Sequence, residues 1–191
     1  DFVTKDTHPT GEYRATLSTP GNDRNPVAIY TFQLEDFVPS RLKTTVELPS
    51  TVMTPDQEYQ VTVKADHLFG ASASDRRSGC EAIITKGDWQ PESWPGYRFS
   101  NDEAFRPDRV NLGEKQTGDD GSAQYTFSYV PSAEATFPLA ARFVGSVYEL
   151  GGRVVKDAAE AVFFPSEVCL GVRANKVQDS SSVEVHVAAV A

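Results

Sequence analysis

Apolar and polar positions alternate with a period of two in many short stretches of the chain, and this pattern predicts β-strands. The clearest pair is Arg142–Tyr148 and Val154–Phe164, which flank the loop Glu149–Arg153 with its two adjacent glycines. A tight reversal needs φ > 0, which glycine adopts without steric cost, so the segment predicts a β-hairpin. One face of its first strand holds Phe143, Gly145 and Val147. We expect this hairpin to close a β-sandwich.

Similar alternating stretches occur along the rest of the chain, at 11–17, 27–34, 42–48, 59–65, 79–85, 123–130, 168–173 and 183–190. Clusters of Gly, Pro, Asp and Ser separate them, and no stretch convincingly predicts a helix. Short strands joined by turns favour an all-β fold, an antiparallel β-sandwich of the immunoglobulin or fibronectin-like kind.

Breaks in the strand pattern divide the chain into three parts. We expect C-terminal strands of a preceding domain in 1–38, a complete sandwich in 39–165, and the first strands of a following domain in 166–191. The junction is Glu35–Arg41, because Pro39 cannot donate to a sheet, and Phe37 and Val38 could fill the seam there. The chain starts without methionine and ends inside an alternating run, so we expect a piece of a longer protein.

The strand pattern fails over 86–116, which we expect to be an irregular insert rich in aromatic residues. Long stretches without an element are usually functional or packed as a cover. The prolines and Gly96 favour a fixed lid over the sandwich. The other interpretation is a platform for a sugar or a partner peptide. The rings that would form either one are Trp89, Trp94, Tyr97 and Phe99.

The charge balance argues against some partners. The chain has 18 Lys and Arg against 27 Asp and Glu, a net charge of −9, whereas nucleic acid or an anionic membrane calls for a basic patch. No apolar run reaches the roughly 20 residues that span a bilayer.

Motifs for catalysis are missing. The histidines His8, His67 and His186 are far apart, and the chain has no GxSxG, Walker or GxGxxG motif. Asp119-Asp120-Gly121 predicts a turn, because the residues after it lack the ligands of a calcium loop. Glu149 and Glu160 do not support glycosidase chemistry. We therefore expect no catalytic, metal or cofactor-binding residues.

The two cysteines, Cys80 and Cys169, leave three interpretations open. A structural disulfide is the first, two separate buried thiols the second, and a reactive thiol the last. Neither cysteine lies in a CxxC motif or beside an activating histidine.

Six segments, in their order and spacing, resemble the macroglobulin-like domains of bacterial α2-macroglobulins. They are Thr10–Arg14, Glu35–Arg41, Ala65–Ala71, Trp94–Phe99, Asp120–Ala123 and Val147–Val155. Leu170–Arg173 resembles the start of the following domain. Ser72 departs from the family, which commonly has proline there. The CxEQ-type thioester motif of the family is absent, since Glu81-Ala82-Ile83 follow Cys80 and Leu170-Gly171-Val172 follow Cys169.

The resemblance implies a macroglobulin-like β-sandwich that acts as a non-catalytic scaffold fragment of a broad-spectrum protease inhibitor. It implies neighbouring macroglobulin-like domains and, through the whole protein, target proteases as partners. It also implies a role in bacterial defence in the periplasm, with the whole protein anchored to the inner membrane as a lipoprotein. That setting would permit a Cys80–Cys169 disulfide. The alternative is a carbohydrate- or peptide-binding module of a cell-envelope protein that uses the aromatic insert.

Overall fold

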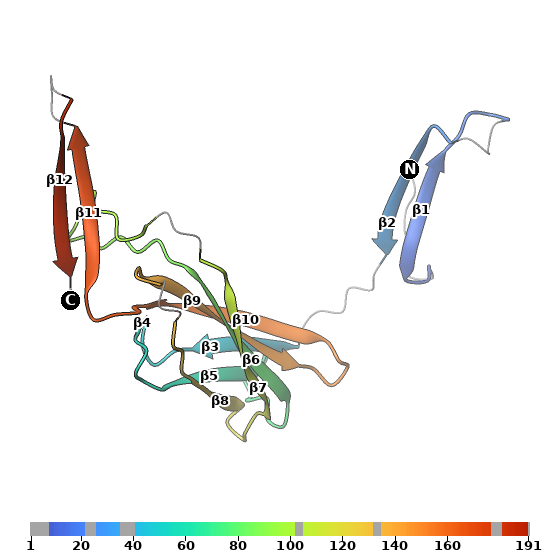
Figure 1. Cartoon of the computed structure of the whole chain (residues 1–191). Helices are drawn as coiled ribbons and strands as arrows, with labels where there is room; N and C mark the ends of the chain where they lie inside the picture. Colours follow the sequence, from blue (N-terminus) through green and yellow to red (C-terminus); the bar gives the residue numbers. More distant parts are fainter. Residues whose placement is uncertain are drawn as a thin grey trace. The chain divides into compact units, whose positions relative to one another are not determined.

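All regular structure in the described residues is β-strand, as the sequence predicts (Figure 1). The computed structural model describes residues 8–21, 26–34, 41–101, 105–131, 135–176 and 181–190. Within these ranges no helix is long and apolar enough to cross a membrane. The chain divides into two compact units, 1–40 and 41–191.

The first unit is a two-stranded antiparallel hairpin of β1 (Gly11–Leu17) and β2 (Ala28–Leu34). Tyr13 lies opposite Phe32, and their rings stack with centroids 5.7 Å apart. The backbone N–H of Val27 donates to Leu17 and closes the hairpin at 2.7 Å. The expected seam residues Phe37 and Val38 lie outside the described residues.

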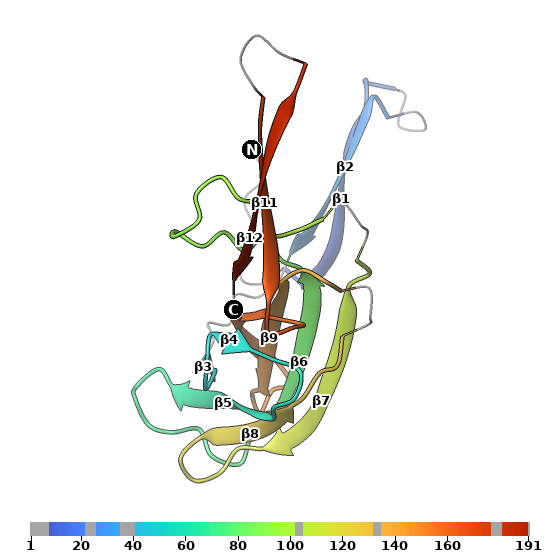
Figure 2. The same cartoon turned by 60° about the vertical axis from the view of Figure 1, so that its left-hand side comes forward.

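The second unit contains an antiparallel β-sandwich, which confirms the predicted fold class (Figure 2). Its three-stranded sheet has the order β3 (Leu42–Glu47), β5 (Tyr59–His67), β8 (Ser122–Phe127). Its five-stranded sheet has the order β4 (Val52–Met53), β10 (Val154–Phe163), β9 (Leu139–Tyr148), β6 (Arg77–Lys86), β7 (Asp108–Gln116). The short β4 pairs with β10 in parallel, and the other pairings are antiparallel.

The core lies between these two sheets, where the inward positions of each strand are apolar. In β5 these positions are Tyr59, Val61, Val63 and Ala65, all buried, in the predicted phase. The rings of Phe127 and Phe143 meet edge to face with centroids 4.8 Å apart. Gly145 of β9 lets the two sheets approach, because a Cβ there would lie 2.7 Å from a methyl group of Val46.

The predicted β9–β10 hairpin is present, and its side chains also hold β3. Gly152 has φ 83°, and the backbone N–H of Glu149 donates to Arg153 across the turn. The Glu149 carboxylate accepts hydrogen bonds from the backbone N–H groups of Arg41 (2.7 Å) and Leu42 (3.2 Å). Further along, the Asp157 carboxylate accepts one from Val46 at 3.0 Å. Backbone donors of the edge strand β3 thus find partners in the opposite sheet.

The irregular insert is shorter than the expected 86–116, because 108–116 form β7. The sequence pattern hides this strand for two reasons. It is largely exposed along its length, and its pairing with β6 shifts register between Cys80 and Glu81. Gly113, at the shift, has φ 93°. Such a bulge breaks the period of two from which strands are recognised.

After the sandwich the chain forms a second hairpin, of β11 (Cys169–Lys176) and β12 (Val183–Val190). This C-terminal hairpin has alternating side chains, as predicted, and its apolar residues are largely exposed, among them Leu170, Val183, Val185 and Val187. The insert, drawn in green in Figure 1, extends from the sandwich and contacts this hairpin through an isolated β-bridge between Arg98 and Val172.

Candidate functional site at the insert and the C-terminal hairpin

The insert is fixed to the sandwich where it begins. The backbone N–H of Gly87 donates to the carbonyl of Pro138 at 3.1 Å. A Cβ on Gly87 would lie 2.7 Å from that same carbonyl oxygen, so the close approach requires glycine. The Lys86 ammonium, at the end of β6, donates to the carbonyl of Asn101 in the later part of the insert.

Further along, the insert contacts β11. Arg98 and Val172 form a reciprocal pair of backbone hydrogen bonds, of 2.8 Å from the Arg98 N–H and 2.9 Å from the Val172 N–H. Next to this pair, the buried ring of Phe99 lies on Gly171. A Cβ on Gly171 would lie 2.6 Å from two ring carbons, which is closer than real Cβ atoms come. Glycine at 171 is therefore what allows the ring to lie against the strand.

The aromatic side chains of the insert form edge-to-face pairs. Trp89 packs on Phe99 at 5.0 Å and on Phe164, just after β10, at 4.9 Å. Trp94 meets Tyr97 at 5.3 Å with an interplanar angle of 81°. The guanidinium of Arg173 on β11 lies 4.9 Å from the Tyr97 ring centroid, a cation–π distance.

The lid and the platform considered from the sequence both stay predictions. Trp89, Trp94 and Tyr97 are half-buried, and the ring planes meet at 68° in the Trp89–Phe99 pair and at 81° in the Trp94–Tyr97 pair. Phe99 is buried, yet it lies outside the core cluster of the sandwich. The insert therefore links the sandwich to the C-terminal hairpin. Sequence reasoning missed this link because the signal, Gly171 opposite a ring, appears only once the chain is folded.

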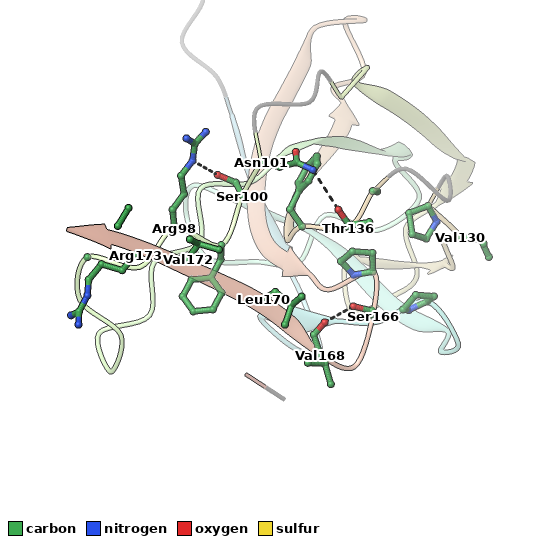
Figure 3. A pocket seen from close by; sticks show the side chains of 18 of the residues that line it. Arg98, Ser100, Asn101, Val130, Thr136, Ser166, Val168, Leu170, Val172 and Arg173 are labelled. Carbon is green, nitrogen blue, oxygen red and sulfur yellow. Dashed lines mark hydrogen bonds between the residues drawn. The ribbon is translucent and has the colours of Figure 1, made fainter. Parts of the chain in front are cut away.

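An open groove of about 1100 Å³ lies beside this link, between the insert, the sandwich loops and β11 (Figure 3). Its apolar lining includes Phe99, Phe137, Val168, Leu170 and Val172, and its polar lining includes Arg98, Ser100, Asn101, Thr136, Ser166 and Arg173. The polar groups mostly bond one another or the backbone. The amide of Asn101 donates to Thr136 at 3.5 Å, and the Ser166 hydroxyl donates to the carbonyl of Val168 at 2.7 Å. The described lining of the groove includes no histidine, and it includes the carboxylate of Asp56.

The two cysteines are free in the structure, which contradicts the disulfide interpretation. Lys86 lies at the end of the sheet where β10 finishes. Cys80 lies opposite Gly145, six residues away from Lys86 along β6. Cys169 follows that end, in the C-terminal hairpin. Six strand residues span about 20 Å, whereas the Cα atoms of a disulfide lie within about 7 Å of each other.

Both thiols are buried, in agreement with the second interpretation. Burial raises the pKa of Cys80 to about 12, with a smaller contribution from the negative charge of Glu81. Burial also raises the pKa of Cys169. A thiol that stays protonated at neutral pH is a poor nucleophile, so neither cysteine fits a reactive role.

The other acidic residues considered for chemistry make hydrogen bonds or ion pairs within the domain. The Asp120 carboxylate accepts hydrogen bonds from the hydroxyl (2.7 Å) and the backbone N–H (3.0 Å) of Ser122, which lower its pKa. Gly121 has φ 76°, so the predicted turn is present. Glu160 lies 3.9 Å from Arg142 on the exposed face of the sheet. Within the described ranges, no group of three or more His, Cys, Asp or Glu residues could hold a metal ion.

The fold and these contacts define a β-sandwich domain joined through an insert to the next hairpin. The family model of the bacterial alpha-2-macroglobulin MG5 domain matches residues 40–165. The chain therefore belongs to the bacterial alpha-2-macroglobulin family, as the resemblance of its segments indicates.

Curated relatives and solved structures agree with this assignment. Alpha-2-macroglobulin of Xylella fastidiosa is 28% identical over 170 residues, which cover 86% of this chain and 10% of the relative. That of Escherichia coli strain K12 is 27% identical over 149 residues, 78% of this chain and 9% of the relative. The chain thus spans about a tenth of the length of these relatives.

Two solved structures share the fold with a TM-score of 0.60. Trypsin-activated alpha-2-macroglobulin from Escherichia coli is 24% identical, and the match covers 87% of this chain and 11% of that one. Salmonella alpha-2-macroglobulin reacted with methylamine is 22% identical, with 94% and 12% covered.

Proposed function

We propose that this chain is a non-catalytic structural scaffold within an alpha-2-macroglobulin-type protein that traps proteases. The match of residues 40–165 to the MG5 domain carries this proposal. The Escherichia coli relative has been solved after activation by trypsin and after activation by porcine elastase, which supports a whole protein that responds to proteases.

The use of the carboxylates in this chain supports a structural role. Glu149 accepts hydrogen bonds from the first backbone N–H groups of the sandwich, and Asp157 accepts one from Val46. Asp120 bonds Ser122 in a turn. General acid–base catalysis needs a carboxyl group that faces a substrate. These groups are engaged with the backbone and the turns of their own domain.

Exposed apolar side chains support contact with further domains of the whole protein. Leu68 and Phe69, in the loop after β5, are 67% and 81% exposed, and Leu150, in the β9–β10 turn, is 88% exposed. Both loops contact Arg41, whose carbonyl accepts from the Leu68 N–H and whose N–H donates to Glu149. An apolar group of this kind suits a protein–protein contact. We propose a neighbouring macroglobulin-like domain as its partner.

The remaining parts of the proposal come from the family. The bait segment and any thioester would be supplied by other parts of the whole protein. We propose a periplasmic location, with the whole protein held at the inner membrane as a lipoprotein. Target proteases would meet the whole protein, and this domain would keep its neighbours in register.

Protease retention by three proteins tests the proposal: the whole protein, the whole protein without residues 40–165, and the 191-residue chain alone. Each is mixed with active trypsin and separated by size. We expect only the intact whole protein to carry trypsin in its fraction. Retention by the chain alone, or undiminished retention after the deletion, would overturn the scaffold role.

A further inference from the structure

The C-terminal hairpin is joined to the sandwich in two ways within the described residues. The first is the covalent connection after β10, where the Phe164 N–H donates to Met53 at 2.8 Å and Pro165 follows. The second is the contact of Arg98 and Phe99 with Gly171 and Val172, which we call the latch. The covalent connection can act as a pivot. The latch then fixes the angle between the C-terminal hairpin and the sandwich.

The latch is small and lies over a hollow. It consists of one reciprocal pair of backbone hydrogen bonds and one ring on a glycine, with the Arg173–Tyr97 contact beside it. The groove of about 1100 Å³ separates this part of β11 from the sandwich loops, so direct packing behind the latch is limited (Figure 3). Elements with few buried contacts open locally at a lower free energy than the core.

One polar atom beside the latch lacks a hydrogen-bond partner. The Nε atom of Arg173 is buried without a hydrogen-bond partner, although its guanidinium lies near the Tyr97 ring. A buried donor without an acceptor is unfavourable, and rotation of the hairpin away from the insert would return it to water. The closed latch thus contains both the contacts that hold it and a group that favours release.

We propose that the latch is a releasable coupling, which in its closed form sets the angle of the C-terminal hairpin to the sandwich and in its open form lets the hairpin pivot at Pro165–Val168. Hinges are a few loop or element-terminal residues that absorb large φ/ψ changes, and Pro165–Val168 lie between the end of β10 and the start of β11. The coupling is a property of this chain alone and does not depend on protease trapping.

Hydrogen exchange of the intact chain tests the coupling, because the Arg98 and Val172 amides each donate across the latch. The reference is Ala65, whose amide donates to Gly121 inside the sandwich. In the unaltered protein we expect Arg98 and Val172 to exchange faster than Ala65 and to respond little to low urea, as local opening does. Exchange at one common rate with one common urea dependence would show that the latch opens only when the sandwich unfolds, and would overturn the proposal.

Variants at the latch give an independent test. Gly171→Ala places a Cβ against the Phe99 ring, whereas Gly151→Ala adds a Cβ where nothing lies within 4 Å. We expect Gly171→Ala to speed exchange at Arg98 and Val172 about tenfold or more, a change equivalent to about 1.4 kcal/mol, with Ala65 unchanged. Gly151→Ala should change none of the three amides. In a Phe99→Ala background, Gly171→Ala should have no further effect, because the clash is gone.

Tryptophan fluorescence reports the opening of the latch independently of hydrogen exchange. Trp89 and Trp94, the two tryptophans of the chain, both lie in the insert, and Trp89 packs on Phe99. With Trp94→Phe as background, we expect Gly171→Ala to shift Trp89 emission to longer wavelength as its surroundings become wetter. Unchanged emission together with unchanged exchange at Arg98 and Val172 would overturn the proposal.

Discussion

The carboxylate of Glu149 accepts a hydrogen bond of 2.7 Å from the backbone N–H of Arg41, 108 residues earlier in the chain. The turn of the β9–β10 hairpin thereby holds the first described residue of the sandwich. Arg41 also accepts a hydrogen bond from Leu68, so three separate segments meet there. The glycines of this turn reverse the chain, and Glu149, just before them, binds the backbone of the first described residues of the sandwich.

Replacing Glu149 with alanine should destabilise the sandwich. The change leaves the N–H groups of Arg41 and Leu42 without the carboxylate that accepts from both. Hydrogen bonds to a partly exposed charged group suggest a loss of about 1–2 kcal/mol in the free energy of unfolding, measured in urea. The control is Glu160→Ala, which removes an exposed ion pair 3.9 Å long and should cost at most about 0.5 kcal/mol. Equal losses in the two variants would contradict the role given to Glu149.

Alanine at Gly145 should also destabilise the protein, for a steric reason. Its Cβ would lie 2.7 Å from a methyl group of Val46 and 2.9 Å from one of Val63, and these branched side chains fill the core. Overpacking of this kind costs about 1–3 kcal/mol. Gly151→Ala is the matched control, since it meets open space. Urea unfolding of both variants decides the point, and a Gly145→Ala protein as stable as the control would refute the close approach of the sheets.

Thiol labelling should find two unreactive cysteines in the folded protein and two reactive ones after unfolding. Both thiols are free and buried, and both have raised pKa values, so little thiolate forms at neutral pH. The measurement is labelling without reductant, first in buffer and then in denaturant. If no thiol were labelled in denaturant, the cysteines would be joined, and the arrangement of Cys80 and Cys169 described above would be wrong.

Stability should fall as the pH rises above 9. The pKa of Cys80 is raised from 9.0 to about 12 in the folded protein, so the unfolded chain loses this proton first. The stabilisation by the protonated thiol is therefore complete below pH 9 and is lost progressively between pH 9 and 12. Unfolding free energies measured on both sides of pH 9 should show a weaker dependence in Cys80→Ala than in the unaltered protein. An identical pH dependence would mean that Cys80 is not the group responsible.

The sequence predicts those elements whose signal is local. The alternation in Tyr59–Ala65 and the glycine turn before Val154–Phe163 depend on neighbours in the chain, and both elements form as predicted. The sequence does not predict strand β7, because an exposed strand with a bulge at Gly113 loses its period of two.

The candidate site could not be predicted from local patterns. Aromatic residues in the insert were recognised, but their partners, Gly171, Val172 and Arg173, lie more than 70 residues away in the chain. The disulfide hypothesis failed for the same reason, since the position of Cys169 relative to Cys80 depends on how the chain leaves the sheet. Pairings set by tertiary packing leave little trace in one sequence.

The central proposal is that this domain acts as a non-catalytic scaffold. It would contribute to protease trapping by positioning the neighbouring domains of the whole protein. The most direct measurement is trypsin retention by the whole protein carrying Gly171→Ala, compared with the same protein carrying Gly151→Ala. The first change disturbs the contact of Phe99 with β11, and the second meets nothing within 4 Å. We predict that Gly151→Ala retains trypsin like the unaltered protein and that Gly171→Ala retains less. Equal retention by the two variants would contradict the claim.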